Sequence, residues 1–408
     1  MIFNTWVYAV FLLATFVLYW SLPVRWRPWA LIAFGFYFYW YYHPIHTLLI
    51  ATTTLLVFGA SRLVQPGAGP RRRPWFILAT AGCLGLLAYY KYQGFAYDSV
   101  TWVMGLAGTS AHFDYPHLLP PLAISFFVFE YVHYLIEVYR GTFPPAGLRD
   151  FTLFIMFFPT LICGPIKRFQ QFNPQEYSQQ PLSAENVNAG LERILFGLAK
   201  KTLIADSVAP LCAPVFAHPE AYSWGQLWLA VYGYAMQIYF DFSGYSDIAI
   251  GSARLFGYRV QENFNYPYLQ VNIANFWRAW HISLTSWITD YVYIPLGGNR
   301  KGKARSYLNR FISMTLCGLW HGASFHFVVW GMYHGIGLNL YRLYSGLRGR
   351  VLGPKRRPEP LALRVLSGLF TFHFVCIGWV LFVCELDKGW FIIRRLLGVW
   401  SPNALLPG

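Results

Sequence analysis

The sequences GLWHG at residues 318–322 and GMYHG at residues 331–335 decide the fold of this 408-residue chain. Each carries two glycines four residues apart, a spacing that lets two helices approach closely. His321 lies in the first stretch, within an apolar segment. An ionisable group in a membrane span is costly and is therefore functional by default. We predict a helical membrane protein whose function centres on His321.

The composition of the whole chain points the same way. Of its residues, 56% are hydrophobic, 20% are aromatic and only 12% are charged, whereas a soluble protein carries about 25% charged residues. The net charge of +15 comes from short basic clusters between apolar segments, as in cytoplasmic loops. These features argue against nucleic-acid binding. They favour an all-α polytopic membrane protein with a single domain over residues 1–408.

The apolar segments recur from end to end. A helix needs ~20 apolar residues to cross a hydrocarbon core of ~30 Å, and several segments here are shorter, as re-entrant or tilted helices are. We expect about ten to twelve membrane-embedded helices by this criterion. The candidates lie near residues 6–22, 28–43, 45–61, 75–90, 118–138, 151–165, 202–216, 222–240, 308–325, 326–344, 365–385 and 389–400.

Basic residues alternate between the predicted loops. The loops at 22–28, 61–74 and 138–150 carry arginines, whereas the 42–46 turn has no basic residue and the 91–117 loop has only Lys91. Since cytoplasmic loops are enriched in Lys and Arg, we predict a multi-pass membrane protein whose N-terminus lies outside the cytoplasm. Further cytoplasmic features are expected at Lys167-Arg168, Lys200-Lys201, the basic residues of 300–305, and Lys355-Arg356-Arg357.

Two other features limit the classes of protein to which this chain can belong. The six cysteines contain no C-x-x-C pair and lie in apolar surroundings, which predicts reduced core thiols and no metal site. The first residues lack the basic start of a cleavable signal peptide, so the first apolar segment is expected to stay as a span. No Walker loop, nucleophile elbow or H-E-x-x-H motif is present in the sequence.

Residues 273–291 are expected to form one helix with an aromatic stripe. At ~100° per residue, Trp277, Trp280 and His281 fall on the same apolar face, and Arg278 lies elsewhere. One interpretation is an interfacial helix anchored by its tryptophans, with a histidine that only forms hydrogen bonds. Catalysis by His281 is an equally supported interpretation on this evidence.

His321, which follows Trp320, has a more specific setting. Close helix packing around it would hold the imidazole in one orientation and exclude lipid. Desolvation favours the neutral imidazole, the form that a general base needs. The structural alternative is a histidine satisfied by a backbone carbonyl. His334 is the neighbour expected to support His321.

Two further segments carry candidate residues. Asp241 and Asp247 flank Gly244, where we expect a helix break; the carboxylates would cap helix ends or hold arginines, and catalysis is a second possibility. Residues 293–300, which include Asn299 and Arg300, are expected to form a turn leading to the basic cluster. That cluster either follows the positive-inside rule or binds the phosphates of a donor such as coenzyme A.

Several motifs together resemble the membrane-bound O-acyltransferase (MBOAT) family, in particular its bacterial alginate and cell-wall O-acetylation branch. The resemblance covers roughly residues 118–340. It rests on PLAISFF at 121–127, Phe158-Pro159 with CGPI at 163–166, YFDFSGYSD at 239–247, NFNYP at 263–267, FWRAWH at 276–281, YIPLGGNR at 293–300 and the two glycine motifs.

The resemblance implies a fold, an activity and site residues. It implies a ring of tilted helices around a central funnel or tunnel, with His321 as the essential catalytic residue and His281 as the second active-site residue. The expected reaction moves an acetyl group from a cytoplasmic thioester, acetyl-CoA, to an extracytoplasmic polysaccharide or a periplasmic transferase partner, without a metal. Candidate binding or supporting residues are Trp277, Arg278, Trp280, Asp241, Asp247, Trp320, His334, Asn299 and Arg300.

Other functions stay open at this point. Within the family, the alternative is transfer of D-alanine from a carrier-protein thioester to teichoic acid. Outside it, His281 and His321 could form the proton relay of a transporter or flippase, although such proteins usually show internal repeats. A non-catalytic scaffold for a periplasmic partner is a third possibility.

Overall fold

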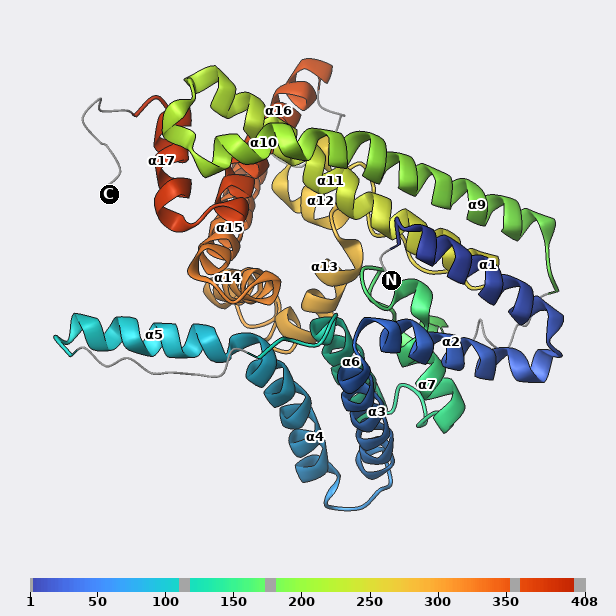
Figure 1. Cartoon of the computed structure of the whole chain (residues 1–408). Helices are drawn as coiled ribbons and strands as arrows, with labels where there is room; N and C mark the ends of the chain where they lie inside the picture. Colours follow the sequence, from blue (N-terminus) through green and yellow to red (C-terminus); the bar gives the residue numbers. More distant parts are fainter. Residues whose placement is uncertain (1–2, 110–117, 173–180, 353–359, 400–408) are drawn as a thin grey trace. The chain divides into compact units, whose positions relative to one another are not determined.

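The computed structural model describes residues 3–109, 118–172, 181–352 and 360–399, and this part of the chain is helical without strands (Figure 1). The prediction of an all-α protein is therefore confirmed for these residues. Contacts between Cα atoms group the chain into two compact units. The first comprises residues 1–198 and 244–262, and the second comprises 199–243 and 263–408.

The first unit begins with helices that follow the predicted apolar segments closely. The segments expected at 6–22, 28–43 and 45–61 each become one helix. Its helices are α1 (Trp6–Ser21), α2 (Arg27–Tyr42), α3 (Pro44–Val64), α4 (Arg72–Leu87), α5 (Gln93–Leu106), α6 (Ile124–Arg140), α7 (Leu148–Met156), α9 (Ala184–Leu198) and the end of α11 (Trp224–Leu255).

Two of these helices were not expected. α5 occupies most of the stretch predicted to be an external loop at 91–117, of which residues 110–117 lie outside the described residues. α9 was missed because its sequence, AENVNAGLERILFGL, is amphipathic rather than continuously apolar. A search for long apolar runs does not detect such a helix.

The expected break near Gly244 is wrong, because α11 runs through this position without interruption. A Cβ atom on Gly197 of α9 would lie 2.6 Å from the Gly244 carbonyl oxygen, so the two helix backbones touch there. Asp247, which is buried, accepts a hydrogen bond from Arg193 Nε at 2.6 Å. Its predicted role in holding an arginine is confirmed, although it caps no helix.

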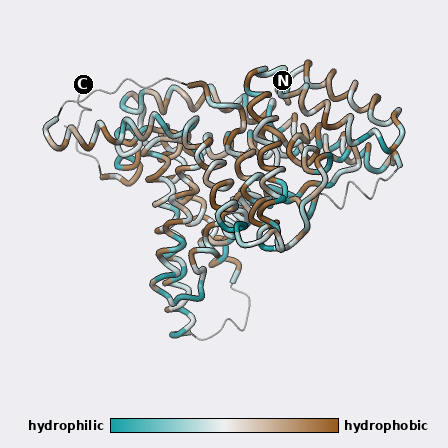
Figure 2. The backbone as a smooth tube through the Cα atoms, turned by 90° about the horizontal axis from the view of Figure 1, so that it is seen from below, coloured by the Kyte–Doolittle hydropathy of each residue, from teal (hydrophilic) through white to brown (hydrophobic). Residues whose placement is uncertain are grey.

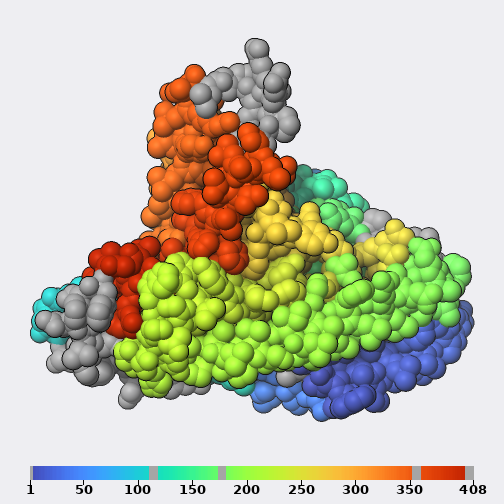
Figure 3. Space-filling view, turned by 90° about the horizontal axis from the view of Figure 1, so that it is seen from above, coloured from blue at the N-terminus to red at the C-terminus, as the bar shows by residue number. Residues whose placement is uncertain are grey.

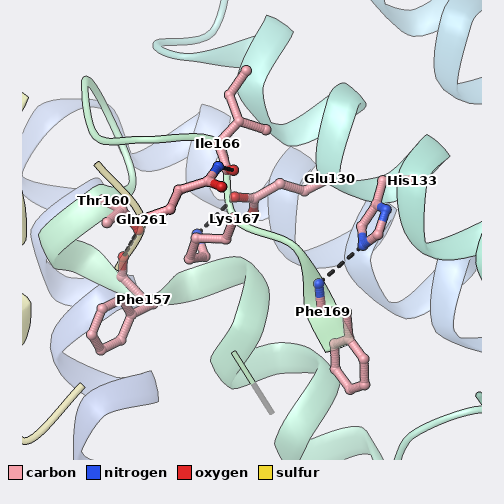
Figure 4. A network of polar contacts seen from close by, with 8 residues as sticks. All are labelled: Glu130, His133, Phe157, Thr160, Ile166, Lys167, Phe169 and Gln261. Atoms are coloured by element: carbon pink, nitrogen blue, oxygen red, sulfur yellow. Dashed lines mark hydrogen bonds and ion pairs between the residues drawn. The ribbon is translucent and has the colours of Figure 1, made fainter. Parts of the chain in front are cut away.

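Lys167 and Arg168, which were expected as cytoplasmic features, are buried side chains, 4% and 6% exposed. Lys167 Nζ donates to Glu130 Oε1 at 2.7 Å, and the Phe169 backbone N–H donates to His133 Nε2 at 3.0 Å (Figure 4). α6 supplies both acceptors. The segment after Pro165 thus enters the core because buried groups on α6 compensate its charge and its backbone polarity.

The second unit contains the remaining helices. In Figure 3, α15 and α16 lie side by side in orange and red, in agreement with the contacts between them. Lys355–Arg357 between them lies outside the described residues. The helices are α10 (Asp206–Ala217), the start of α11, α12 (Ile273–Ala279), α13 (Ile282–Ile288), α14 (Lys303–His321), α15 (Phe325–Leu352), α16 (Leu361–Val383) and α17 (Leu386–Leu396).

Close glycine packing between α14 and α15 is confirmed. A Cβ atom on Gly318 would lie 2.1 Å from the Phe327 carbonyl oxygen, and one on Gly331 would lie 2.4 Å from the Met314 carbonyl oxygen. Neither position has room for a side chain. Because His321 is the last residue of α14, this contact fixes the end of the helix that carries it.

Hydrophobic residues, brown in Figure 2, recur along the helices. Within the described ranges, two helices, α3 and α16, are both long and apolar enough to cross a membrane, and α1 is apolar but shorter. Large apolar side chains on them are exposed, such as Leu56 at 68% and Phe370 at 74%. The expected ten to twelve embedded helices and the central funnel stay predictions.

The glycine contact gives a direct stability test. Gly331→Ala places a methyl group against the Met314 carbonyl, and overpacking of this kind costs about 1–3 kcal/mol. We expect a lower melting temperature in nanodiscs. Gly346→Ala on the same helix is the matched control, because nothing lies within 4 Å of its Cβ. It should match or exceed the stability of the wild type; equal losses in both variants would contradict the packing.

The buried ion pair gives a second test. Lys167→Met leaves the Glu130 carboxylate buried without its cation, a change that costs roughly 3–5 kcal/mol. Adding Glu130→Gln removes the uncompensated charge, so the double variant should melt at a higher temperature than Lys167→Met. Additive losses in a double-mutant cycle would show that the two side chains do not stabilise each other.

Candidate active site

His281 lies at a break between two short helices, not on the single helix that its sequence predicted. α12 ends at Ala279 and α13 begins at Ile282. The Ala279 carbonyl accepts from the Asn265 N–H, and the Ile282 N–H donates to the Asn263 carbonyl, both at 2.9 Å. These bonds replace a helical turn. The predicted common face of Trp277, Trp280 and His281 is therefore wrong.

The break puts His281 in a strained conformation. Its φ is +44°, in the left-handed region, which non-glycine residues seldom adopt. Such residues cost about 1–3 kcal/mol and concentrate at functional sites. The imidazole is 1% exposed. Burial, together with the nearby His321, lowers the pKa of His281 well below its ordinary value, so the ring is neutral at pH 7.

One side-chain oxygen organises the polar groups around His281. Asn263 Oδ1 lies 3.1 Å from His281 Nδ1, 3.2 Å from the Ser283 backbone nitrogen and 2.9 Å from Ser283 Oγ. Asn263 and Ser283 are both buried. The imidazole is thus held from its Nδ1 side, and its Nε2 atom is buried without a hydrogen-bond partner among the described residues.

The structure brings the two predicted catalytic histidines together through Trp320. The Trp320 ring centroid lies 5.9 Å from that of His281 and 4.8 Å from that of His321. His321 is half-buried, and its ring also packs against the rings of Trp330 and Phe382, with centroid distances of 5.2 Å and 5.1 Å. An imidazole that is held by aromatic rings and keeps some exposure is placed to meet a substrate.

The other predicted aromatic and histidine residues support this cluster from outside. Trp280 packs on Trp379, with 4.9 Å between the ring centroids. His334 is fully buried, and its ring centroid lies 5.1 Å from that of Trp277 and 5.0 Å from that of Trp330. Trp330 in turn contacts His321. The Trp330 ring therefore lies between His334 and His321, and His334 supports His321 through this ring.

Arg278 and Asn299 line a basic pocket of about 770 Å³ in the second unit. The pocket lies between α12, α14 and α15, and no carboxylate of the described residues lines it. The Asn299 amide oxygen accepts hydrogen bonds from Tyr293 and Ser306, which ties the predicted turn to α14. Arg300 is exposed and does not line the pocket. The basic lining residues are Arg278, Lys303, Arg310, Arg342 and Arg350.

The two predicted aspartates act as partners of cations. Asp241 accepts from Lys201 at 2.6 Å, and Lys201 also pairs with Asp206 at the same distance. Lys201 was expected only as a cytoplasmic charge, so this pairing was missed. Asp247 pairs with Arg193 in the first unit, as described above. Asp247 holds an arginine as expected, whereas Asp241 pairs with a lysine and caps no helix end.

Sequence reasoning missed several residues of the site. Asn263 was part of a quoted motif but was given no role, and Phe242, 4.6 Å from the His281 ring centroid, had none. Trp330 and Phe382 line the His321 ring. The only signal for Asn263 in the sequence was its place as a polar residue in an aromatic stretch. Among the described residues no group of three His, Cys, Asp or Glu forms a metal site, and metal independence stays a prediction.

A family model supports the resemblance seen in the sequence. The model of the membrane-bound O-acyltransferase family matches residues 122–383. This match includes His281, His321 and His334, and it extends beyond the C-terminal limit of 340 that the sequence motifs gave.

Individual relatives cover most of the chain. The "Probable alginate O-acetylase AlgI" of Pseudomonas putida is 38% identical over 390 residues, which is 94% of this chain and 78% of the relative. The peptidoglycan O-acetyltransferase of Helicobacter pylori is 32% identical over 92% of this chain and 75% of the relative. The teichoic acid D-alanyltransferase of Bacillus subtilis is 31% identical over 65% of this chain and 70% of its own length.

Proposed function

Because the chain belongs to the membrane-bound O-acyltransferase family, we propose that it transfers an acetyl group from a cytoplasmic thioester to a hydroxyl of an extracytoplasmic polysaccharide. The observation that carries this proposal is the pair of imidazoles, His281 and His321, that contact the same Trp320 ring. Relatives named as acetylating enzymes match more than nine-tenths of the chain, which favours acetyl as the transferred group.

The proposed chemistry uses His321 as the general base, beside the buried and neutral imidazole of His281. His321 takes the proton of the acceptor hydroxyl as the oxygen attacks the thioester carbonyl carbon. The C–O bond forms, the C–S bond breaks, and the proton passes from the imidazolium to the leaving thiolate. His281 positions the reacting group or assists the proton transfer. No step requires a metal ion.

Acetyl-CoA is the donor that fits the basic pocket. Arg278, Arg342 and Lys303 supply positive charge without a competing carboxylate, as recognition of phosphate groups requires. α12 presents Arg278 to this pocket and ends two residues before His281. The same helix therefore links the donor's phosphates to the reaction centre.

The acceptor and the membrane orientation complete the proposal. The polysaccharide lies on the far side of the inner membrane, and a periplasmic transferase partner is the alternative acceptor that relays the acetyl group. The alternation of basic loops favours cytoplasmic entry of the donor and a periplasmic N-terminus. Transfer across the membrane then occurs at one site between the two compartments.

Transfer of D-alanine from a carrier-protein thioester is the second candidate. Relatives named as teichoic acid D-alanyltransferases are about 30% identical to this chain. They match about two thirds of it, whereas the acetylating relatives match over nine-tenths. The acetyl reaction is therefore preferred.

The role of His321 is tested with purified protein in nanodiscs and radiolabelled acetyl-CoA. His321→Ala should lower label transfer or thioester hydrolysis by at least about 100-fold, since general-base catalysis contributes roughly 10²–10⁴-fold. His218→Ala, which changes an exposed loop histidine, is the control and should keep activity. Full activity in His321→Ala would refute the role, and label that is only transported would support a transporter instead.

Phosphate binding by the basic pocket is tested by comparing acetyl-CoA with acetyl-pantetheine, a shorter donor. Arg342→Gln should raise the KM for acetyl-CoA about 10-fold, because hydrogen bonds to charged groups contribute roughly 1.5–3 kcal/mol. It should not change the KM for acetyl-pantetheine, which lacks the nucleotide phosphates. Arg364→Gln, on an exposed arginine outside the pocket, is the control. Equal effects on both donors would show that the pocket does not bind phosphate.

A further inference from the structure

The hydrogen bonds of Asn263 determine which nitrogen of His281 carries its proton. The side-chain atom called Oδ1 lies 3.2 Å from the Ser283 backbone nitrogen. A backbone N–H only donates, so the atom that it meets must be an acceptor. An amide nitrogen cannot accept, and this contact therefore identifies the atom as the carboxamide oxygen, whatever orientation of the amide is assumed.

The same oxygen then fixes the state of the imidazole. His281 Nδ1 lies 3.1 Å from Asn263 Oδ1, and two acceptors do not bond to each other. Ser283 Oγ also lies 3.5 Å from Nδ1, but its hydroxyl donates to the closer Asn263 oxygen at 2.9 Å, so Nδ1 carries the hydrogen of the His281–Asn263 contact. A neutral imidazole has one N–H, so Nε2 keeps its lone pair. That lone pair is buried and has no hydrogen-bond partner among the described residues.

The backbone holds this arrangement in place from both sides. Asn263 accepts from the Ile282 N–H at 2.9 Å, and Asn265 donates to the Ala279 carbonyl at 2.9 Å. His281 is held between these bonds with φ +44°. Its ring also packs against the rings of Phe242 and Trp320.

We propose that Asn263 is a positioning residue, which holds His281 as the Nδ1–H tautomer so that Nε2 accepts a hydrogen bond from a second hydroxyl of the acceptor, next to the one that reacts. This deepens the proposed function and rests on it. His281 thus positions the acceptor, since a neutral ring in this tautomer has no proton on Nε2 to give. His321 takes the proton of the reacting hydroxyl and passes it to the leaving thiolate.

The alternative role of Asn263 is only structural. Its oxygen accepts from Ser283 near the start of α13 and so also caps that helix. A cap alone predicts a change in stability but does not predict a particular tautomer of His281. The tautomer is therefore the observation that separates the two roles.

Solid-state NMR of protein labelled with ¹⁵N-histidine measures the tautomer in nanodiscs. The chain has 11 histidines, and the difference between wild type and His281→Gln identifies the signals of His281. At pH 7 we expect a protonated Nδ1 and an unprotonated Nε2. A protonated Nε2 of His281 in the wild type overturns the proposal.

Variants connect the tautomer to turnover. Asn263→Ala should release the tautomer and lower kcat about 10- to 100-fold, the range found for residues that orient a reacting group, with the KM for acetyl-CoA unchanged. Asn263→Asp keeps the accepting oxygen and should restore the Nδ1–H signal and part of kcat. Ser283→Ala, which keeps the His281–Asn263 bond, should leave the tautomer as in the wild type.

The outcomes distinguish a failure of the positioning role of Asn263 from a failure of the proposed acyl transfer. An Nδ1–H signal that Asn263→Ala abolishes, without any acyl transfer by the wild type, would contradict the proposed function but not the hydrogen-bond assignment. Acyl transfer with a wild-type kcat in Asn263→Ala would overturn the positioning role and leave the proposed function standing.

Discussion

The rest of the site depends on one hydrogen-bonding constraint, the pairing of residues 263–265 with residues 279–282. These backbone bonds end α12 and start α13 with His281 between them in the left-handed region. Without them, the 273–291 segment would continue as a helix and carry the imidazole to another face. The backbone hydrogen bonds of Asn263 and Asn265 thus compensate the conformational strain at His281. Strained residues that are held by their surroundings are common at functional sites.

The second histidine reaches the same place by close helix packing. Gly318 and Gly331 allow α14 and α15 to touch backbone to backbone, and the end of α14 carries Trp320 and His321. Trp320 then contacts both imidazoles. Burial lowers the pKa of His281 and keeps this imidazole neutral, and it makes the contact with Asn263 stronger than it would be in solvent.

The sequence predicted the helical class, most helix positions and the close packing of α14 on α15, because these leave local signals such as apolar runs and glycine spacing. It failed where tertiary bonds override local periodicity. The break at His281, the unbroken α11 at Gly244 and the burial of Lys167 each depend on a partner distant in the chain, such as Asn263, Gly197 or Glu130. A basic residue shows its charge in the sequence but not the carboxylate that compensates it.

The central claim is that His281 and His321 form the reaction centre of an O-acyltransferase. Its most direct test is a cryo-EM structure with an acetyl-CoA analogue whose thioester sulfur is replaced so that it cannot react. We expect the analogue's carbonyl group next to the His281 and His321 rings, with its phosphates beside Arg278 and Arg342. A bound analogue whose carbonyl lies away from both rings would contradict the account.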